Sequence, residues 1–236
     1  MTDLKLYRKF CLLGTLGALL MLVGDLCLSV VPAHEGDSGL FARQAYFDGL
    51  YGANRFPLLL VTGLCGMALC SFAVRAIHTQ ILPECGKTRA AIKVSGIIYL
   101  TSAGVIHFMI GSLADWISRL TPIVGKEEAL NLVMEQYNRL MPCFPLAYAG
   151  MIALILVSAF ASLTKRTFLP RKLFVFHMLV WQLVFVMIPD IRQALGMKIS
   201  TWDFVLSQGS GNASLFIFMI SNAIWAFRTD KAPRRE

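Results

Sequence analysis

Long apolar runs, separated by short polar segments, make up most of the chain, and six of them are long enough to cross about 30 Å of hydrocarbon as α-helices. Charged residues delimit several runs, such as Lys93 before the third and Arg171-Lys172 before the fifth. The runs are continuous and do not alternate with polar residues, which excludes a transmembrane β-barrel. The pattern predicts an all-α integral membrane bundle of six transmembrane helices, one domain over 1–236, with spans near 10–31, 56–77, 94–116, 144–164, 172–189 and 208–227.

Two segments between the predicted spans are amphipathic and predict helices that lie at the outer surface of the membrane. Residues 37–51 combine aromatic positions, such as Phe41 and Tyr46, with charged ones. Residues 126–141 place apolar side chains, including Val133, at helical spacing against acidic and basic ones. These segments either cover the outer mouth of the bundle or serve only as anchors in the interface.

The composition agrees with a membrane protein. The chain is 56% hydrophobic and 15% charged, whereas a soluble domain is roughly 45–50% apolar and about 25% charged. Lysine and arginine concentrate in the N-terminal segment, the C-terminal segment and alternate connections, so the positive-inside rule predicts that both termini are cytoplasmic in a bacterial inner membrane. The net charge of +8 then reflects topology and anionic membrane lipids, and basic residues dispersed over short segments predict no nucleic-acid partner.

Asp25 and His107 stand inside stretches that are otherwise apolar. A charge at membrane depth costs roughly 2.5–3.5 kcal/mol on insertion scales, so such residues usually have a use. Small residues share the helix face of each, for example Gly14 with Asp25 and Gly104 with His107, which indicates that both side chains point toward protein rather than lipid. We therefore expect a polar site inside the bundle.

Other polar residues fall in the same outer half of the predicted membrane, and we expect them to bind a ligand. Arg55 can bind a phosphate or carboxylate through two hydrogen bonds. The glycine-rich run 209–212 is predicted to begin the last span, where free backbone N–H groups favour an anionic or carbonyl group. The expected ligand-binding residues are Arg55, Asp115, Gln182, Gln208, Gly211 and Asn212.

These residues leave three functions open. A multi-pass membrane protein could bind a small amphipathic or lipid-like ligand in an outward-facing pocket, with Asp25 and His107 as a protonation switch or structural lock. An intramembrane enzyme could use the two as a catalytic acid–base pair on a lipid-like substrate. A membrane subunit without a ligand would instead expose small-residue faces, such as Thr62, Gly66 and Ala73, to a partner helix.

The sequence lacks the motifs of several enzyme classes. It contains neither H-E-x-x-H nor G-x-S-x-G, and His107 and His177 are predicted at opposite depths, so we predict no metal site and no cofactor. A metal held by Asp25, His107 and Asp115 and a disulfide between Cys27 and Cys143 stay open. The expected partners are membrane lipids, a lipid-like or anionic small molecule, and further copies of the chain.

The chain resembles a family of uncharacterised bacterial multi-pass membrane proteins, a domain of unknown function. The likeness rests on Gly24-Asp25 in the first span, Arg55 at the start of the second, His107 followed eight residues later by Asp115, and Gly211-Asn212. It covers roughly residues 10–227, and this chain has aspartate where we expect glutamate after the histidine. The resemblance implies a shared six-helix fold and a shared outer polar site, and it implies no activity.

Overall fold

A computed structural model describes residues 3–231 as helices joined by loops, with no strand in this part of the chain. Six helices in the described range are long and apolar enough to cross a membrane, which confirms the predicted all-α bundle. The elements are α1 (Leu4–Ser29), α2 (Gln44–Phe47), α3 (Arg55–Gln80), α4 (Gly86–Val124), α5 (Lys126–Leu140), α6 (Cys143–Leu163), the 3₁₀-helix η1 (Arg171–Phe176), α7 (Met178–Ala194) and α8 (Thr201–Lys231).

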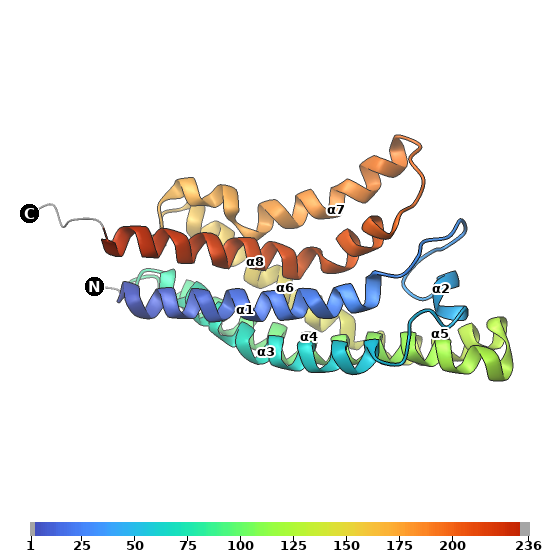
Figure 1. The fold of residues 1–236 in the computed structure, drawn as a ribbon. Coiled ribbons are helices and arrows are strands. Elements are labelled where there is room, and N and C mark those ends of the chain that lie inside the picture. Colours follow the sequence, from blue (N-terminus) through green and yellow to red (C-terminus); the bar gives the residue numbers. More distant parts are fainter. Residues whose placement is uncertain (1–2, 232–236) are drawn as a thin grey trace, which may run out of the picture.

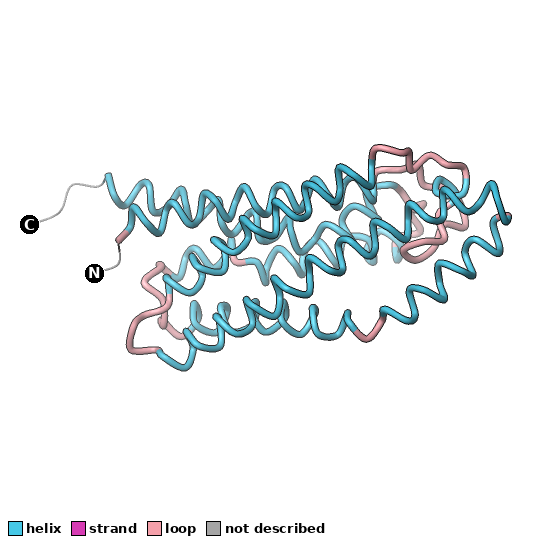
Figure 2. Tube along the Cα trace, turned by 90° about the horizontal axis from the view of Figure 1, so that it is seen from below, coloured by secondary structure: helices cyan, strands magenta, loops and turns pink. Residues whose placement is uncertain are grey.

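The long helices pack side by side in the order α6, α4, α3, α1, α8 and α7, and η1 lies between α6 and α8. Figure 1 shows that α1 begins and α8 ends at the same end of the bundle, which we call the terminal end. The short α2 and the amphipathic α5 lie at the opposite end, which we call the roof end (Figure 1). The loops gather at these two ends, as Figure 2 shows from below.

Helices α1 and α3 approach each other backbone to backbone through small residues. A Cβ atom at Gly17 would lie 2.6 Å from the backbone nitrogen of Cys70, and one at Gly66 would lie 2.9 Å from the backbone nitrogen of Met21. Glycine is required at such positions because real Cβ contacts are longer. The small-residue face of Thr62, Gly66 and Ala73 is therefore buried against α1, so it is not the exposed partner surface expected for a membrane subunit.

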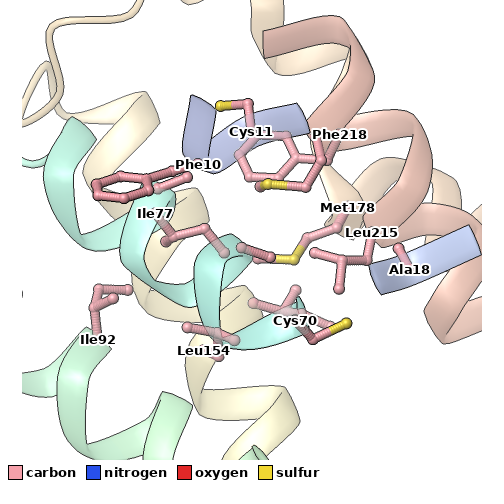
Figure 3. Packing of buried hydrophobic residues seen from close by; sticks show 14 of the residues in the cluster. Phe10, Cys11, Ala18, Cys70, Ile77, Ile92, Leu154, Met178, Leu215 and Phe218 are labelled. Atoms are coloured by element: carbon pink, nitrogen blue, oxygen red, sulfur yellow. The ribbon is translucent and has the colours of Figure 1, made fainter. Parts of the chain in front are cut away.

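The terminal half of the bundle is filled by an apolar core. Every long helix contributes to it, and Figure 3 shows these side chains interdigitating in the space between the helices. The labelled members are Phe10, Cys11, Ala18, Cys70, Ile77, Ile92, Leu154, Met178, Leu215 and Phe218. The polar residues predicted to form a site, such as Asp25 and His107, lie toward the roof end, where the side chains between the helices leave a cavity.

The close contact between α1 and α3 leads to a first prediction. The substitution Gly17→Ala should destabilise the protein by about 1–3 kcal/mol, because the added methyl group meets backbone atoms that have no rotamer to change. Thermal unfolding in detergent measures the loss. Gly86→Ala is the matched control, since a Cβ at Gly86 meets nothing within 4 Å. Equal unfolding temperatures for the two variants would contradict the close approach of α1 and α3.

The structure corrects three local predictions. The glycine-rich run 209–212 lies inside α8 and does not begin a helix, because α8 begins at Thr201. Asp203 caps this start, because its Oδ2 accepts hydrogen bonds from the backbone N–H of Ser200 at 2.7 Å and from Ser200 Oγ at 2.9 Å. The fifth span, predicted to end near 189, continues to Ala194 as α7, with Pro189 inside the helix. The predicted interface helix over 37–51 is mostly loop, whereas residues 126–141 do contain the predicted helix, α5.

Candidate functional site

A cavity of about 510 Å³ lies among the long helices toward the roof end. Residues of α1, α3, α4, α6, α7 and α8 line it, and Leu40 of the loop after α1 and Tyr137 of α5 close it at the roof. Most of the lining is apolar. The polar lining side chains come mainly from α1, α4, α7 and α8, and six of them are Asp25, His107, Gln182, Gln208, Ser210 and Asn212.

Asp25 is the centre of this polar group. Its carboxylate is buried, and Asn212 of α8 donates a hydrogen bond from Nδ2 to Asp25 Oδ2 at 2.7 Å. His107 of α4 approaches the other oxygen, with 3.7 Å between Nδ1 and Asp25 Oδ1. Three helices that are distant in the sequence thus meet at one carboxylate. The expected pair of Asp25 and His107 lies together in the structure.

Two glycines make room for the imidazole ring of His107. A Cβ at Gly24 of α1 would lie 2.6 Å from His107 Nε2, and a Cβ at Gly63 of α3 would lie 2.8 Å from His107 Cδ2. His107 Nε2 is buried and has no hydrogen-bond partner among the described residues. The pair Gly24-Asp25 therefore acts as a unit, in which the glycine admits the ring and the aspartate faces its Nδ1.

A second group of hydrogen bonds joins α7 and α1 to α8. Gln182 donates from Nε2 to Ser210 Oγ at 2.9 Å and accepts a hydrogen bond from Ser214 Oγ at 3.3 Å. Ser29 Oγ donates to Gln208 Oε1 at 2.8 Å. These contacts fix the amide side chains on the cavity wall. Gly211 also lines the cavity, and a Cβ there would be in ordinary van der Waals contact with Met151 Sδ at 3.6 Å and Gln182 Oε1 at 3.8 Å.

Arg55 has a different environment from the one expected. Its Nη1 donates to the backbone carbonyls of Cys27, at 3.2 Å, and Val30, at 2.6 Å. Arg43, fully buried in the roof, donates to the carbonyl of Ser29 from Nη1 and to that of Val31 from Nη2, both at 3.0 Å. The last carbonyls of a helix lack partners within it and carry partial negative charge, so both arginines hold the end of α1.

Tyr46 completes this cap. Its hydroxyl group donates to the carbonyl of Leu28 at 2.9 Å. Burial is the main cause that raises the pKa of the Tyr46 phenol, so the group stays protonated and keeps donating. Tyr46 thereby connects the end of α1 to α2, at a position only a few residues after Asp25. Neither Arg43 nor Tyr46 was expected from the sequence as a residue that positions the site.

Asp115 also lies outside the cavity lining. It is buried on α4 and forms an ion pair with Arg119 one turn later, with 2.6 Å between Asp115 Oδ2 and Arg119 Nε. Six of the eight expected site residues therefore line one cavity, and Arg55 and Asp115 do not. The structure does not bring Asp115 together with Asp25 and His107, and the described residues contain no group of three or more His, Cys, Asp or Glu side chains placed to hold a metal.

A second cavity of about 280 Å³ adjoins the first at the roof end. The two share Leu40, Ser207 and Gln208 in their linings. Arg192 and Asp203 also line the second cavity, and they are paired at 2.7 Å between Arg192 Nε and Asp203 Oδ1. This smaller cavity is thus a polar vestibule beside the central one.

The remaining candidates from the sequence have structural roles. His177 caps α7, because its Nδ1 accepts a hydrogen bond from the backbone N–H of Leu179 at 3.1 Å. Its Nε2 lies 3.2 Å from Ser158 Oγ of α6. Cys27 is a free cysteine. The side chain of Cys143, the other cysteine of the disulfide considered above, lies outside the described part of the structure.

The six apolar helices and the buried polar cluster define an all-α membrane protein. The chain belongs to the family of unknown function DUF6796, whose family model matches residues 1–224. No curated protein and no solved structure matches the chain. The match confirms the resemblance to a domain of unknown function.

Proposed function

We propose that this protein binds an amphipathic small molecule in the central cavity. The observation that carries the proposal is the cavity's composition: an apolar space of about 510 Å³ with Asp25, His107 and Asn212 gathered at one wall. Ligand cavities are typically about 300–1,000 Å³, mostly apolar, with a few convergent polar groups. A polar head at Asp25 and an apolar tail against residues such as Ile106 and Met151 would satisfy both surfaces.

The distribution of basic residues supports an outward-facing cavity. The start of α1, the end of α3 and the start of α4 lie at the terminal end and are rich in lysine and arginine, so we place that end in the cytoplasm of a bacterial inner membrane. The cavity then lies in the outer half of the membrane. A C-terminal epitope tag that is detected in intact cells, before permeabilisation, would reverse this orientation.

Mass spectrometry of molecules that co-purify with the protein tests the proposal. Wild type should retain a specific lipid or metabolite that the double variant Asp25→Asn/His107→Gln loses, while both remain folded. Glu135→Gln is a suitable control, because Glu135 is an exposed acid on α5 that pairs with Arg139 and lies outside the cavity lining. If both wild type and the double variant carry only the same bulk lipids, the cavity is not a ligand site and Asp25 and His107 are structural.

An enzyme is the second candidate, and one contact favours it. Asp25 and His107 both line the cavity, with Oδ1 and Nδ1 only 3.7 Å apart, so both could reach one bound molecule. A carboxylate beside an imidazole suits general acid–base chemistry. If this function is correct, wild type converts its bound molecule to a product of different mass, and Asp25→Asn or His107→Gln binds without converting it. A bound molecule that wild type leaves unchanged after long incubation argues against catalysis.

A further inference from the structure

The charges around the cavity narrow the class of ligand, on the assumption that the cavity binds an amphipathic molecule as proposed above. We infer that the preferred polar head is an amine, and that a phosphate or carboxylate head is rejected. Among the described residues that line the cavity, Asp25 is the one acid, and none is a lysine or arginine. A buried anionic head would therefore meet a carboxylate without a compensating cation, which is unfavourable in a medium of low dielectric constant.

The arginines near the cavity are already engaged. Arg55 and Arg43 donate to the carbonyls at the end of α1, and Arg43 is fully buried there. Arg192 in the vestibule is paired with Asp203 and also donates from Nη2 to the carbonyl of Lys198 at 3.4 Å. Releasing any of these side chains to bind an anion would break its hydrogen bonds to a carbonyl or carboxylate. The contacts of Arg55 therefore do not support the anionic ligand that its presence in the sequence led us to expect.

Asp25 retains an acceptor for an incoming N–H group. Asn212 occupies Oδ2, but Oδ1 accepts no hydrogen bond from the described residues, and the imidazole at 3.7 Å is beyond hydrogen-bond distance. An ammonium group can donate to Oδ1 and neutralise the carboxylate at the same time. Ionisable residues inside a membrane are usually paired with an opposite charge. His107 provides one only when its ring is protonated, so an ammonium head would supply the positive charge that a neutral imidazole lacks.

Aromatic rings on the cavity wall also suit a cation. Tyr99, Tyr137, Phe144 and Tyr148 all line the cavity. The face of an aromatic ring attracts a desolvated ammonium group, an interaction worth about 2 kcal/mol or more when water is excluded. The same rings offer no comparable attraction to an anion. A carboxylate at the polar wall of a cavity that is otherwise mostly aromatic and apolar is thus a site for a long-chain amine.

Three probes with the same tail test the inference: dodecylamine, dodecanol and dodecyl phosphate. Each is titrated into wild type in nanodiscs of neutral phosphatidylcholine, and binding is measured by native mass spectrometry and by the shift in unfolding temperature. Dodecylamine should bind wild type about tenfold or more tightly than dodecyl phosphate, and Asp25→Asn should remove that preference. Glu135→Gln should bind like wild type.

The outcomes separate this inference from the proposed function. Binding of all three probes with equal affinity, lost when Ala147→Trp fills the cavity, would overturn the amine preference but leave the ligand cavity intact. Preference for dodecyl phosphate would overturn the inference directly. An amine preference that persists in Asp25→Asn would show that the bilayer or another site selects the amine. Binding of none of the probes to wild type would contradict both proposals.

Discussion

The substitution Arg43→Leu is expected to destabilise this protein more than any other single change in the roof, by about 3–5 kcal/mol. Arg43 is fully buried, its guanidinium donates to the carbonyls of Ser29 and Val31, and its Cζ lies 4.0 Å from the centre of the Phe204 ring. Leucine would remove the charged donor from both carbonyls, leaving Ser29 with only the Val31 N–H and Val31 with only Thr201 Oγ1. It would also leave Asp37, 4.0 Å from Arg43 Nε, without its cation. Equilibrium unfolding in detergent measures the difference.

Two controls separate the charge from the geometry of the hydrogen bonds. Arg43→Lys keeps the charge, but one ammonium group cannot reproduce the planar fork that spans both carbonyls, so it should recover only part of the loss. Arg139→Leu removes an exposed arginine that pairs with Glu135, and such surface pairs contribute only about 0.3–0.5 kcal/mol. An Arg43→Leu variant as stable as Arg139→Leu would show that Arg43 does not hold the end of α1.

The bundle could be predicted from the sequence because each membrane helix corresponds to a continuous run of apolar residues. The ends of the helices were harder to predict from the sequence, because a helix can continue for several turns beyond its apolar run. Helix α4 continues to Val124, well past the predicted end near 116, and α8 begins at Thr201, before the predicted start near 208. Asp203, whose carboxylate accepts from the backbone N–H and hydroxyl group of Ser200, is the local signal that identifies the start of α8.

The polar cluster could be predicted in part, because a polar side chain inside an apolar run must face protein. That argument correctly grouped Asp25, His107, Gln182, Gln208, Gly211 and Asn212 around one cavity. Arg55 does not line this cavity, and depth in the membrane does not reveal whether an arginine faces a cavity or the end of a neighbouring helix. The backbone carbonyls that bind Arg55 and Arg43 have no signature in the amino-acid sequence.

The glycines that admit His107 provide the sharpest test of the site. Gly24→Ala should displace the imidazole from its position near Asp25, because the new methyl group would lie 2.6 Å from His107 Nε2. Gly63 of α3 approaches the adjacent Cδ2 of the ring, so the imidazole is closely packed by a second helix as well. We expect a loss of stability of about 1–3 kcal/mol from overpacking and a loss of the co-purifying ligand.

Gly104→Ala is the matched control on the helix that carries His107. A Cβ there would meet only Met67 Cγ, at 3.7 Å, which is ordinary van der Waals contact. Alanine in a helix is favoured over glycine by about 1 kcal/mol, so this variant should be neutral or more stable. The unfolding temperature and the amount of co-purifying ligand are measured for Gly104→Ala in the same way as for Gly24→Ala.

The double variant Gly24→Ala/His107→Ala decides whether Gly24 serves the ring or merely the packing of α1. If the glycine exists to admit the imidazole, removing the ring relieves the overpacking, and the double variant is more stable than the sum of the two single changes predicts. Residues in direct contact show such coupling, typically about 0.5–3 kcal/mol, whereas independent sites add. Additive losses would mean that Gly24 and His107 act separately, and the motif Gly24-Asp25 would then have to be explained by Asp25 alone.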